Sequence, residues 1–376
     1  MRFVIKVGTY LVMKEDHTLN EAFLKDLTAQ IASLVAEGHE AVLVSSGAVA
    51  AGRGELHFDG APKNIPYRQA LAAVGQSVLM ENYRAFFGEY KLHVAQALLT
   101  NYDFTNKENF FNTRNVFEQL LQRGIVPIVN ENDVTTIAEL KFGDNDTLAA
   151  KTAAMISADL VVLLTNVKGL YTAHPEKDPN ARFIDLVEAF DDSIFSVAEK
   201  ATKPGTMGGM YSKVRAAEYA VSSGITACIG NGHTSGIVRR IADFFLAYRT
   251  HGRPAGDFPA TFFPAHKETA PSFKSWMKPQ IVKDARIIVD DGCRDALVTK
   301  GKSLLSTGIR EVQGSFARGD IVELVDCAGK RIGYGQTHYG AQEIEKIKGK
   351  KSAEIEETLG YTYEDEVMHR DRMVVE

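Results

Sequence analysis

Lys6-Val7-Gly8-Thr9 stands where a short apolar run near the start of the chain, residues 3–7, gives way to glycine. The run consists mainly of β-branched and aromatic residues, which favours a buried strand. A pattern of helical period follows, with Asn20 as the expected N-cap and Gly38 as the expected stop. A strand, a glycine turn and a helix in this order predict the opening of a βαβ unit.

The same alternation continues to about residue 230. The expected strands are residues 3–7, 41–44, 93–99, 125–129, 160–164 and 225–229. Beyond the first helix, the expected helices are residues 68–87, 108–122, 146–156 and 210–222. This pattern predicts an α/β fold in which helices cover both faces of an open, mostly parallel sheet.

The composition changes after an expected helix near residues 237–248. We expect a first domain over residues 1–255 and a proline-rich linker with some folded content over residues 256–282. Residues 283–376 hold brief β-like runs separated by glycine turns, at 285–289, 308–312, 320–325 and 331–334. With short helices near 342–347 and 352–359, they predict a small β-rich barrel.

Bulk properties exclude several classes of protein. The chain has 376 residues, of which 45% are hydrophobic, and a net charge of −5, so nonspecific attraction to nucleic acid or to an anionic membrane is not expected. The N-terminus lacks the pattern of a signal peptide, and no apolar run approaches the roughly 20 residues of a membrane span. Three widely spaced cysteines fit neither a zinc ribbon nor a disulfide framework. We therefore expect a cytoplasmic protein.

Ligands of an open parallel sheet bind beyond the carboxyl ends of its strands, so the residues that follow each expected strand are the candidates. The glycine-rich or polar junctions are Lys6-Val7-Gly8-Thr9, Ser45-Ser46-Gly47-Ala48, Asn130-Glu131-Asn132-Asp133 with Gly143-Asp144-Asn145-Asp146, and the residues from Gly205 to Met210 that lead to Lys213. Each alone fits ordinary turn chemistry, and helix capping is an alternative explanation for Asp144 and Asp146. Together, two lysines, open glycine amides and several Asp and Asn residues favour a phosphoryl-transfer site.

The sequence contains only incomplete versions of other nucleotide-binding motifs. Gly301-Lys302-Ser303 lacks the upstream glycine of a P-loop, and Gly52-Arg53-Gly54 lacks the third glycine of a dinucleotide fingerprint. His369-Arg370-Asp371 has no accompanying DFG motif, which argues against a protein kinase. Without an HExxH motif or similar histidine cluster, a metal is expected to be Mg²⁺ held mainly by nucleotide phosphates, with no metal ligands assigned in the protein.

The junctions occur in the order found in amino acid kinases. Within that family, Asn130-Glu131-Asn132-Asp133 paired with Gly143-Asp144-Asn145-Asp146 resembles glutamate 5-kinases most closely. The C-terminal part resembles a PUA domain at Gly308-Ile309, Val312, Gly314, Phe316, Gly319-Asp320 and His369-Arg370-Asp371. The resemblance covers nearly the whole chain.

The resemblance implies ATP-dependent, Mg²⁺-assisted phosphorylation of the L-glutamate side-chain carboxylate. Lys6 and Lys213 would neutralise the transferring phosphoryl group, and Asp146 would hold both lysines. Ser46, Asp133 and Asn145 would bind glutamate. The implied nucleotide-binding residues are Lys6, Gly8, Thr165, Asn166, Met207, Gly208, Gly209, Met210, Tyr211, Ser212 and Lys213. Asn166 and Met207 depart from the Asp and Thr that are usual in the family.

The resemblance also implies the first step of proline biosynthesis, inhibition by proline, a homo-oligomer (dimer or tetramer) and coupling to a glutamyl phosphate reductase. One alternative is a related kinase for another small acid, such as carbamate or N-acetylglutamate. A second alternative is an RNA-binding role for the PUA-like domain, through a patch such as Lys346, Lys348, Lys350 and Lys351. Residues 283–376 hold 15 Lys and Arg against 18 Asp and Glu, a balance of 15 − 18 = −3, which argues against RNA.

Overall fold

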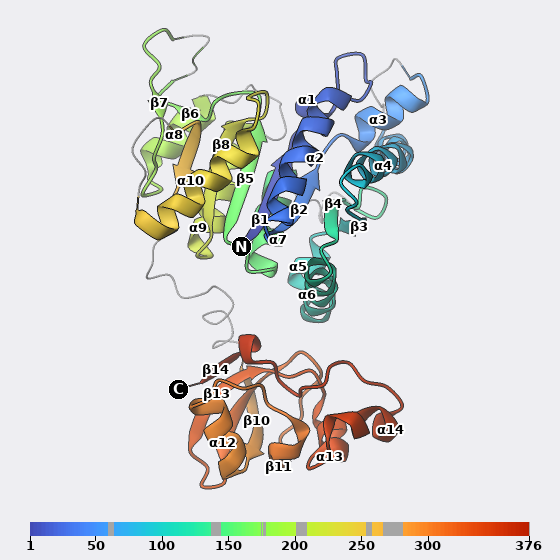
Figure 1. The fold of residues 1–376 in the computed structure, drawn as a ribbon, viewed down its shortest axis with the longest axis vertical. Helices are drawn as coiled ribbons and strands as arrows, with labels where there is room; N and C mark the ends of the chain where they lie inside the picture. Colours follow the sequence, from blue (N-terminus) through green and yellow to red (C-terminus); the bar gives the residue numbers. More distant parts are fainter. Residues whose placement is uncertain are drawn as a thin grey trace. The chain divides into compact units, whose positions relative to one another are not determined.

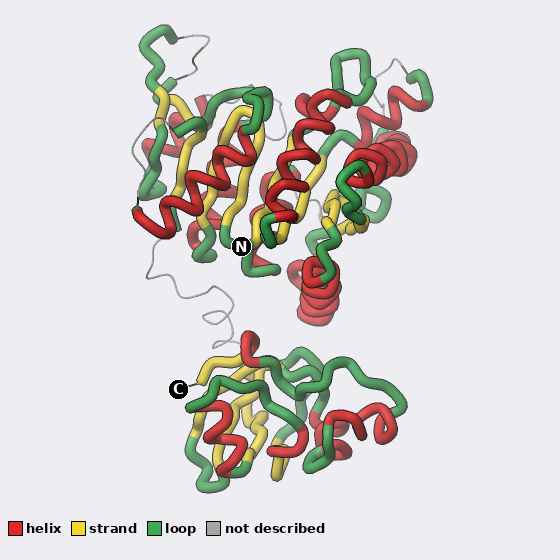
Figure 2. The backbone as a smooth tube through the Cα atoms, viewed as in Figure 1, coloured by secondary structure: helices red, strands yellow, loops and turns green. Residues whose placement is uncertain are grey.

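The structure is a computed structural model that describes residues 1–58, 64–136, 144–173, 175, 178–200, 209–252, 258–265 and 281–375. The chain forms two compact units, Met1–Thr269 and Ala270–Glu376. Figures 1 and 2 show the elements of each unit. Within the described ranges, no helix combines the length and apolarity that crossing a bilayer requires.

The first unit is built on a seven-stranded sheet with the strand order β3-β4-β2-β1-β5-β8-β9. Its strands are β1 (Arg2–Val7), β2 (Glu40–Ser45), β3 (Val94–Leu99), β4 (Val126–Glu131), β5 (Leu160–Thr165), β8 (Thr226–Asn231) and β9 (Ala260–Phe263). The six predicted strands are confirmed, and all their pairings are parallel. Because β1 lies at the centre, the turn that follows Val7 opens beside the ends of β2 and β5.

Helices cover both faces of this sheet, as predicted. The helices on one face are α2 (Glu21–Ala36), α3 (Ala48–Glu55), α4 (Ile65–Gly88) and α10 (Ile237–His251). Those on the other face are α6 (Lys107–Gln122), α7 (Asn145–Met155), α8 (Asp192–Lys200) and α9 (Met210–Ser222). Alternation along β1 supplies both cores, because Phe3 and Ile5 pack into the first cluster and Val4 into the second. The helix α2 is capped by Asn20 and followed by Gly38 at φ 82°, as expected.

The antiparallel edge strand β9 was not predicted as a strand. It pairs with β8 and lies in the stretch 256–282, for which we expected a linker with some folded content. Prolines at 259 and 264 flank this segment and argue against a strand in the sequence, although proline is compatible with an edge strand. The hydroxyl of Thr261 accepts a hydrogen bond from the N–H of Leu170 and donates one to the carbonyl of Ile184. These bonds attach the hairpin of β6 (Leu170–Tyr171) and β7 (Phe183–Ile184), also not predicted, to the sheet edge.

The second unit has its own sheet and its own core. The strand order is β11-β10-β12-β13-β14. The elements are β10 (Ile281–Val289), β11 (Ile309–Gln313), β12 (Ile321–Asp326), β13 (Arg331–Gln336), β14 (Met373–Val375), α12 (Asp291–Val298), α13 (Ala341–Ile347) and α14 (Ile355–Leu359). The four predicted strands and the two short helices are confirmed, whereas α12 and β14 were not predicted. A separate cluster that includes Ile287, Leu324 and Tyr339 forms the core of this unit.

Candidate active site

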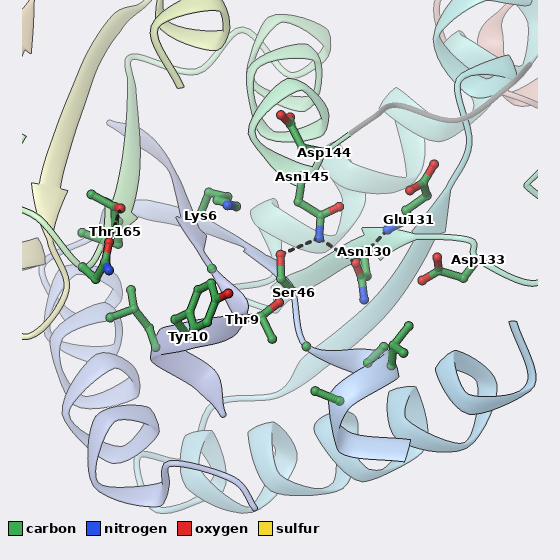
Figure 3. Close-up of a pocket in the computed structure, with 18 of the residues that line it drawn as sticks. Lys6, Thr9, Tyr10, Ser46, Asn130, Glu131, Asp133, Asp144, Asn145 and Thr165 are labelled. Carbon is green, nitrogen blue, oxygen red and sulfur yellow. Dashed lines mark hydrogen bonds between the residues drawn. The ribbon is translucent and has the colours of Figure 1, made fainter. Parts of the chain in front are cut away.

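A cavity of about 390 Å³ opens at the carboxyl ends of β1, β2, β4 and β5. Figure 3 shows the side chains that line it. Of the predicted site residues, the following line the cavity: Lys6, Gly8, Ser46, Asp133, Asn145, Thr165, Asn166 and Lys213. The volume lies within the usual range for ligand sites. The structure thus brings residues of the first three sequence junctions together at one sheet edge with Lys213, which follows the fourth junction.

Two buried lysines share one buried carboxylate beside this cavity. The Nζ atom of Lys6 lies 2.7 Å from Oδ1 of Asp146, and Nζ of Lys213 lies 3.0 Å from Oδ2. Asp146 is fully buried, and Lys6 and Lys213 are only 4% and 5% exposed. Because one carboxylate faces two ammonium groups, the group carries a net positive charge at the cavity wall.

The surroundings lower the pKa values of both Asp146 and Lys213. Burial by itself would raise the pKa of Asp146, but the two ammonium groups outweigh it and leave the pKa below its ordinary value. Burial, together with the charge of Lys6, lowers the pKa of Lys213, although Asp146 opposes this shift. The carboxylate therefore stays ionised and anchors the two cations.

The start of α7 explains how Asp146 reaches its partners. Asp144 is the N-cap, and its carboxylate accepts the backbone N–H of Thr147 at 2.9 Å. Asp146 lies in the first turn, is fully buried and accepts a further hydrogen bond of 2.9 Å from the hydroxyl of Ser212. Helix capping thus accounts for Asp144, whereas Asp146 organises the two lysines.

Three helices at the cavity begin at glycine. They are α1 (Thr9–Val12), α3 and α9, whose N-caps are Gly8, Gly47 and Gly209, and none has a side-chain cap or an acidic residue in its first turn. By contrast, Asn or Asp caps α2, α4, α6 and α7. A Cβ at Gly8 would lie 3.8 Å from Nζ of Lys6, in the space beside that cation. Backbone N–H groups without a side-chain cap, lying beside cations, suit an anionic ligand, so these residues fit a nucleoside triphosphate.

The predicted substrate-binding residues lie on a network of amides. Nδ2 of Asn145 lies 2.9 Å from each of the carbonyl of Ser45, Oγ of Ser46 and Oδ1 of Asn130. Asp133 follows β4 and adds a carboxylate to the same wall. The wall therefore offers both hydrogen-bond donors and acceptors to a small polar ligand.

The predicted nucleotide-binding residues differ in their placement. Thr165 donates a 3.3 Å hydrogen bond to Asn166 at the end of β5. Met210 is buried in the core beneath α9 and does not line the cavity, whereas Tyr211 is 36% exposed and packs edge-on against Phe195. Met207 and Gly208 lie outside the described residues.

Several lining residues were not predicted as site residues. They are Thr9, Tyr10, Arg53, Arg68, Asn130, Glu131 and Asp144, together with apolar residues of α1, α3 and β5. Thr9, Asn130, Glu131 and Asp144 stood within the quoted junctions, and Tyr10 follows directly, so extending each junction would have found them. Arg53 lies one to two turns into α3, the helix that Gly47 opens. Arg68 reaches the site because α4 crosses α3, for which the sequence gives no simple signal.

Comparisons with known proteins agree with this geometry. The profile of the amino acid kinase family matches residues 1–231, and that of the PUA domain matches residues 285–359. A protein of Caldanaerobacter subterraneus subsp. tengcongensis named glutamate 5-kinase is 42% identical over 376 residues, covering 100% of this chain and 98% of the relative. Another glutamate 5-kinase, from Shewanella halifaxensis, is 41% identical over 374 residues, covering 100% and 97%.

Among solved structures, a UMP kinase from Ureaplasma parvum aligns with a TM-score of 0.47 and 14% identity, covering 70% of this chain and 98% of that one. The family assignment rests on the sequence matches, which span both units of the chain. The chain belongs to the amino acid kinase family, among its glutamate 5-kinases, and carries a PUA domain after the kinase unit.

Proposed function

We propose that the chain transfers the terminal phosphoryl group of ATP to the side-chain carboxylate of L-glutamate, giving L-glutamyl 5-phosphate in the first step of proline biosynthesis. The observation that carries the proposal is the pair of buried ammonium groups, Lys6 and Lys213, held by Asp146 at the cavity wall. The names of relatives at about 42% identity over the full chain support glutamate as the acceptor.

The chemistry requires cations more than it requires a base. A glutamate carboxylate is ionised at neutral pH, so its attack on phosphorus needs no proton removal. The obstacle is the approach of an anion to a polyanion. Lys6 and Lys213 offset that repulsion, and fixed charges aimed at a transferring group stabilise its transition state.

The residues of the cavity divide between the two substrates. Bound ATP supplies the phosphoryl group, and Mg²⁺ would neutralise phosphate oxygens beside it. The N–H groups that follow Gly8, Gly47 and Gly209 would hold those oxygens, since no side chain caps them. Thr165 and Asn166 would contact the nucleotide, while Ser46, Asp133 and Asn145 would bind the amino acid.

The deciding experiment measures ADP release with glutamate, aspartate, N-acetylglutamate and carbamate as acceptors. We expect turnover with glutamate at a kcat/KM at least tenfold above that of any other acid, because a buried polar group that loses its partner costs on the order of 1–3 kcal/mol. Preference for another acid would overturn the choice of substrate while keeping the reaction type.

We also propose that proline inhibits the enzyme at the glutamate site. Proline shares the α-carboxylate and the ammonium-type nitrogen of glutamate, which Ser46, Asp133 and Asn145 would recognise. A proline titration at fixed glutamate tests this, and the expected result is competitive inhibition. No inhibition at millimolar proline would contradict it. The acyl phosphate product is hydrolysed readily, so we further propose that a downstream reductase consumes it. Separately, we propose that the enzyme is a homo-oligomer.

A further inference from the structure

Gln76 of α4 ends a chain of side-chain amides that reaches the cavity. It is 7% exposed and is not one of the lining residues. Its Oε1 accepts a 2.9 Å hydrogen bond from Nδ2 of Asn130, which is 3% exposed. The bond links α4 to the end of β4, the strand that leads to Asp133.

Backbone groups at both ends fix the direction of every hydrogen bond in this chain. Oδ1 of Asn130 accepts the backbone N–H of Glu131, which can only donate, so Nδ2 of Asn130 must face Gln76. Nδ2 of Asn145 faces the carbonyl of Ser45, which can only accept. The same NH₂ group also faces Oδ1 of Asn130 and the hydroxyl oxygen of Ser46, as the dashed lines in Figure 3 show. Its two protons are shared among three acceptors, and the nitrogen is the donor in each contact.

The direction of these hydrogen bonds determines which donors and acceptors the cavity presents to a ligand. Since the oxygen of Ser46 accepts from Asn145, its own O–H remains a donor, which suits a carboxylate. Oδ1 of Asn145 has no hydrogen-bond partner among the described residues and remains an acceptor, which suits an ammonium group. A zwitterionic amino acid presents both of these groups.

Close backbone contact holds Gln76 in place. A Cβ at Gly75 would lie 1.9 Å from the carbonyl oxygen of Ala48, and a Cβ at Gly52 would lie 2.0 Å from the carbonyl oxygen of Leu71. The helices α3 and α4 thus cross at Gly52 and Gly75, with no room for side chains between them. Gln76 is the next residue, so its position relative to the start of α3 is set by backbone rather than by flexible side chains.

We propose that Gln76 is a positioning residue for the amino acid substrate. It orients Asn130, which orients Asn145, which in turn directs the hydroxyl proton of Ser46 towards the ligand. The inference rests on the proposed function, because the ligand that it concerns is the acceptor of the phosphoryl group. Loss of Gln76 should therefore weaken binding of the amino acid and leave the nucleotide and phosphoryl transfer nearly unaffected.

Steady-state kinetics of Gln76→Met and Gln76→Glu test the inference. Gln76→Met keeps the length of the side chain and removes the acceptor, so we expect KM for glutamate to rise about tenfold, with kcat and KM for ATP changed less than about twofold. Gln76→Glu keeps an oxygen for Asn130, and we expect KM for glutamate to return to within about threefold of the wild-type value.

The matched control is Gln30→Met. Gln30 is also buried, at 8% exposure, and its Oε1 accepts the N–H of Val238 at 2.7 Å, away from the cavity. This variant should lose stability and keep its KM for glutamate. If Gln76→Met does not fold, Gln76→Asn withdraws the amide by one methylene and should raise KM in the same way.

Unchanged KM for glutamate in Gln76→Met, or an equal rise in Gln30→Met, would overturn the inference. A wild-type enzyme that does not use glutamate would instead contradict the proposed function. The variants are then compared on the acid that the wild type does phosphorylate, where the same rise in KM for that acid is expected.

Discussion

At the scale of single residues, the two cations of the site are expected to contribute mostly to the chemical step. Lys6→Ala and Lys213→Ala each remove an ammonium group that faces the cavity, so we expect kcat at saturating substrates to fall about 10²-fold or more. The measurement is coupled ADP release. Lys25→Ala is the control, because Lys25 is an exposed lysine of α2 that pairs only loosely with Glu21, at 3.6 Å. Near-normal turnover of both cavity variants would exclude the assigned role.

The carboxylate between the lysines is expected to matter for stability. Asp146→Asn leaves two buried ammonium groups without their counter-ion, so the free energy of unfolding at pH 7 should fall by about 3–5 kcal/mol. Asp144→Asn is the matched control two residues away. Asparagine also caps helices well, so its effect on stability should stay below about 1 kcal/mol. Urea unfolding of both variants measures the difference.

The difference between wild type and Asp146→Asn should also depend on pH. The pKa of Asp146 lies below its ordinary value in the folded protein, so the ionised carboxylate stabilises the fold at every pH above about 4. As the pH falls below about 4, proton binding to the unfolded chain removes this contribution. The two unfolding curves should therefore converge in acid, and a constant gap down to pH 2 would contradict the ion-pair explanation.

At the scale of elements, the crossing of α3 and α4 connects packing to the site. Gly75→Ala places a methyl group 1.9 Å from the carbonyl oxygen of Ala48, so α4 must move away. We expect a loss of about 1–3 kcal/mol of stability and a higher KM for glutamate, because α3 follows Ser46 directly. Gly88→Ala, in the last turn of the same helix, meets nothing within 4 Å. It should be neutral or stabilising by up to about 1 kcal/mol in the same unfolding assay.

Some elements and site residues could be predicted from the sequence, and others could not. Strands β1, β2 and β5 were predictable because continuous apolar runs that end in glycine or polar residues mark buried parallel strands. The cluster of Lys6, Asp146 and Lys213 followed from the resemblance together with the rule that strand ends share one edge. Gln76 and Arg68 could not be predicted, because their place depends on a helix crossing set by two glycines 23 positions apart in the chain, at 52 and 75.

At the scale of the whole molecule, all the residues that line the cavity belong to the unit Met1–Thr269. That unit has two hydrophobic cores of its own, and the PUA unit has a third. We therefore expect a chain that ends at residue 269 to fold and to phosphorylate glutamate with a kcat within about threefold of the full chain. Kinetics and thermal unfolding of the two chains test this. An inactive but folded short chain would show that the PUA domain contributes to catalysis.

The edge strand β9 determines how long the edge of β8 stays exposed while the chain is being synthesised. It is the last strand of the kinase sheet in the chain, and it covers the hydrogen-bonding edge of β8. Until residue 263 has emerged, that edge presents open N–H and C=O groups, to which a strand of another nascent chain could add. Ending the chain at 255 rather than 269 would leave the same edge exposed permanently. Because β9 is short and flanked by prolines at 259 and 264, it gives the kinase sheet an edge that resists pairing with another chain, and we expect a chain that ends at 255 to aggregate more than one that ends at 269.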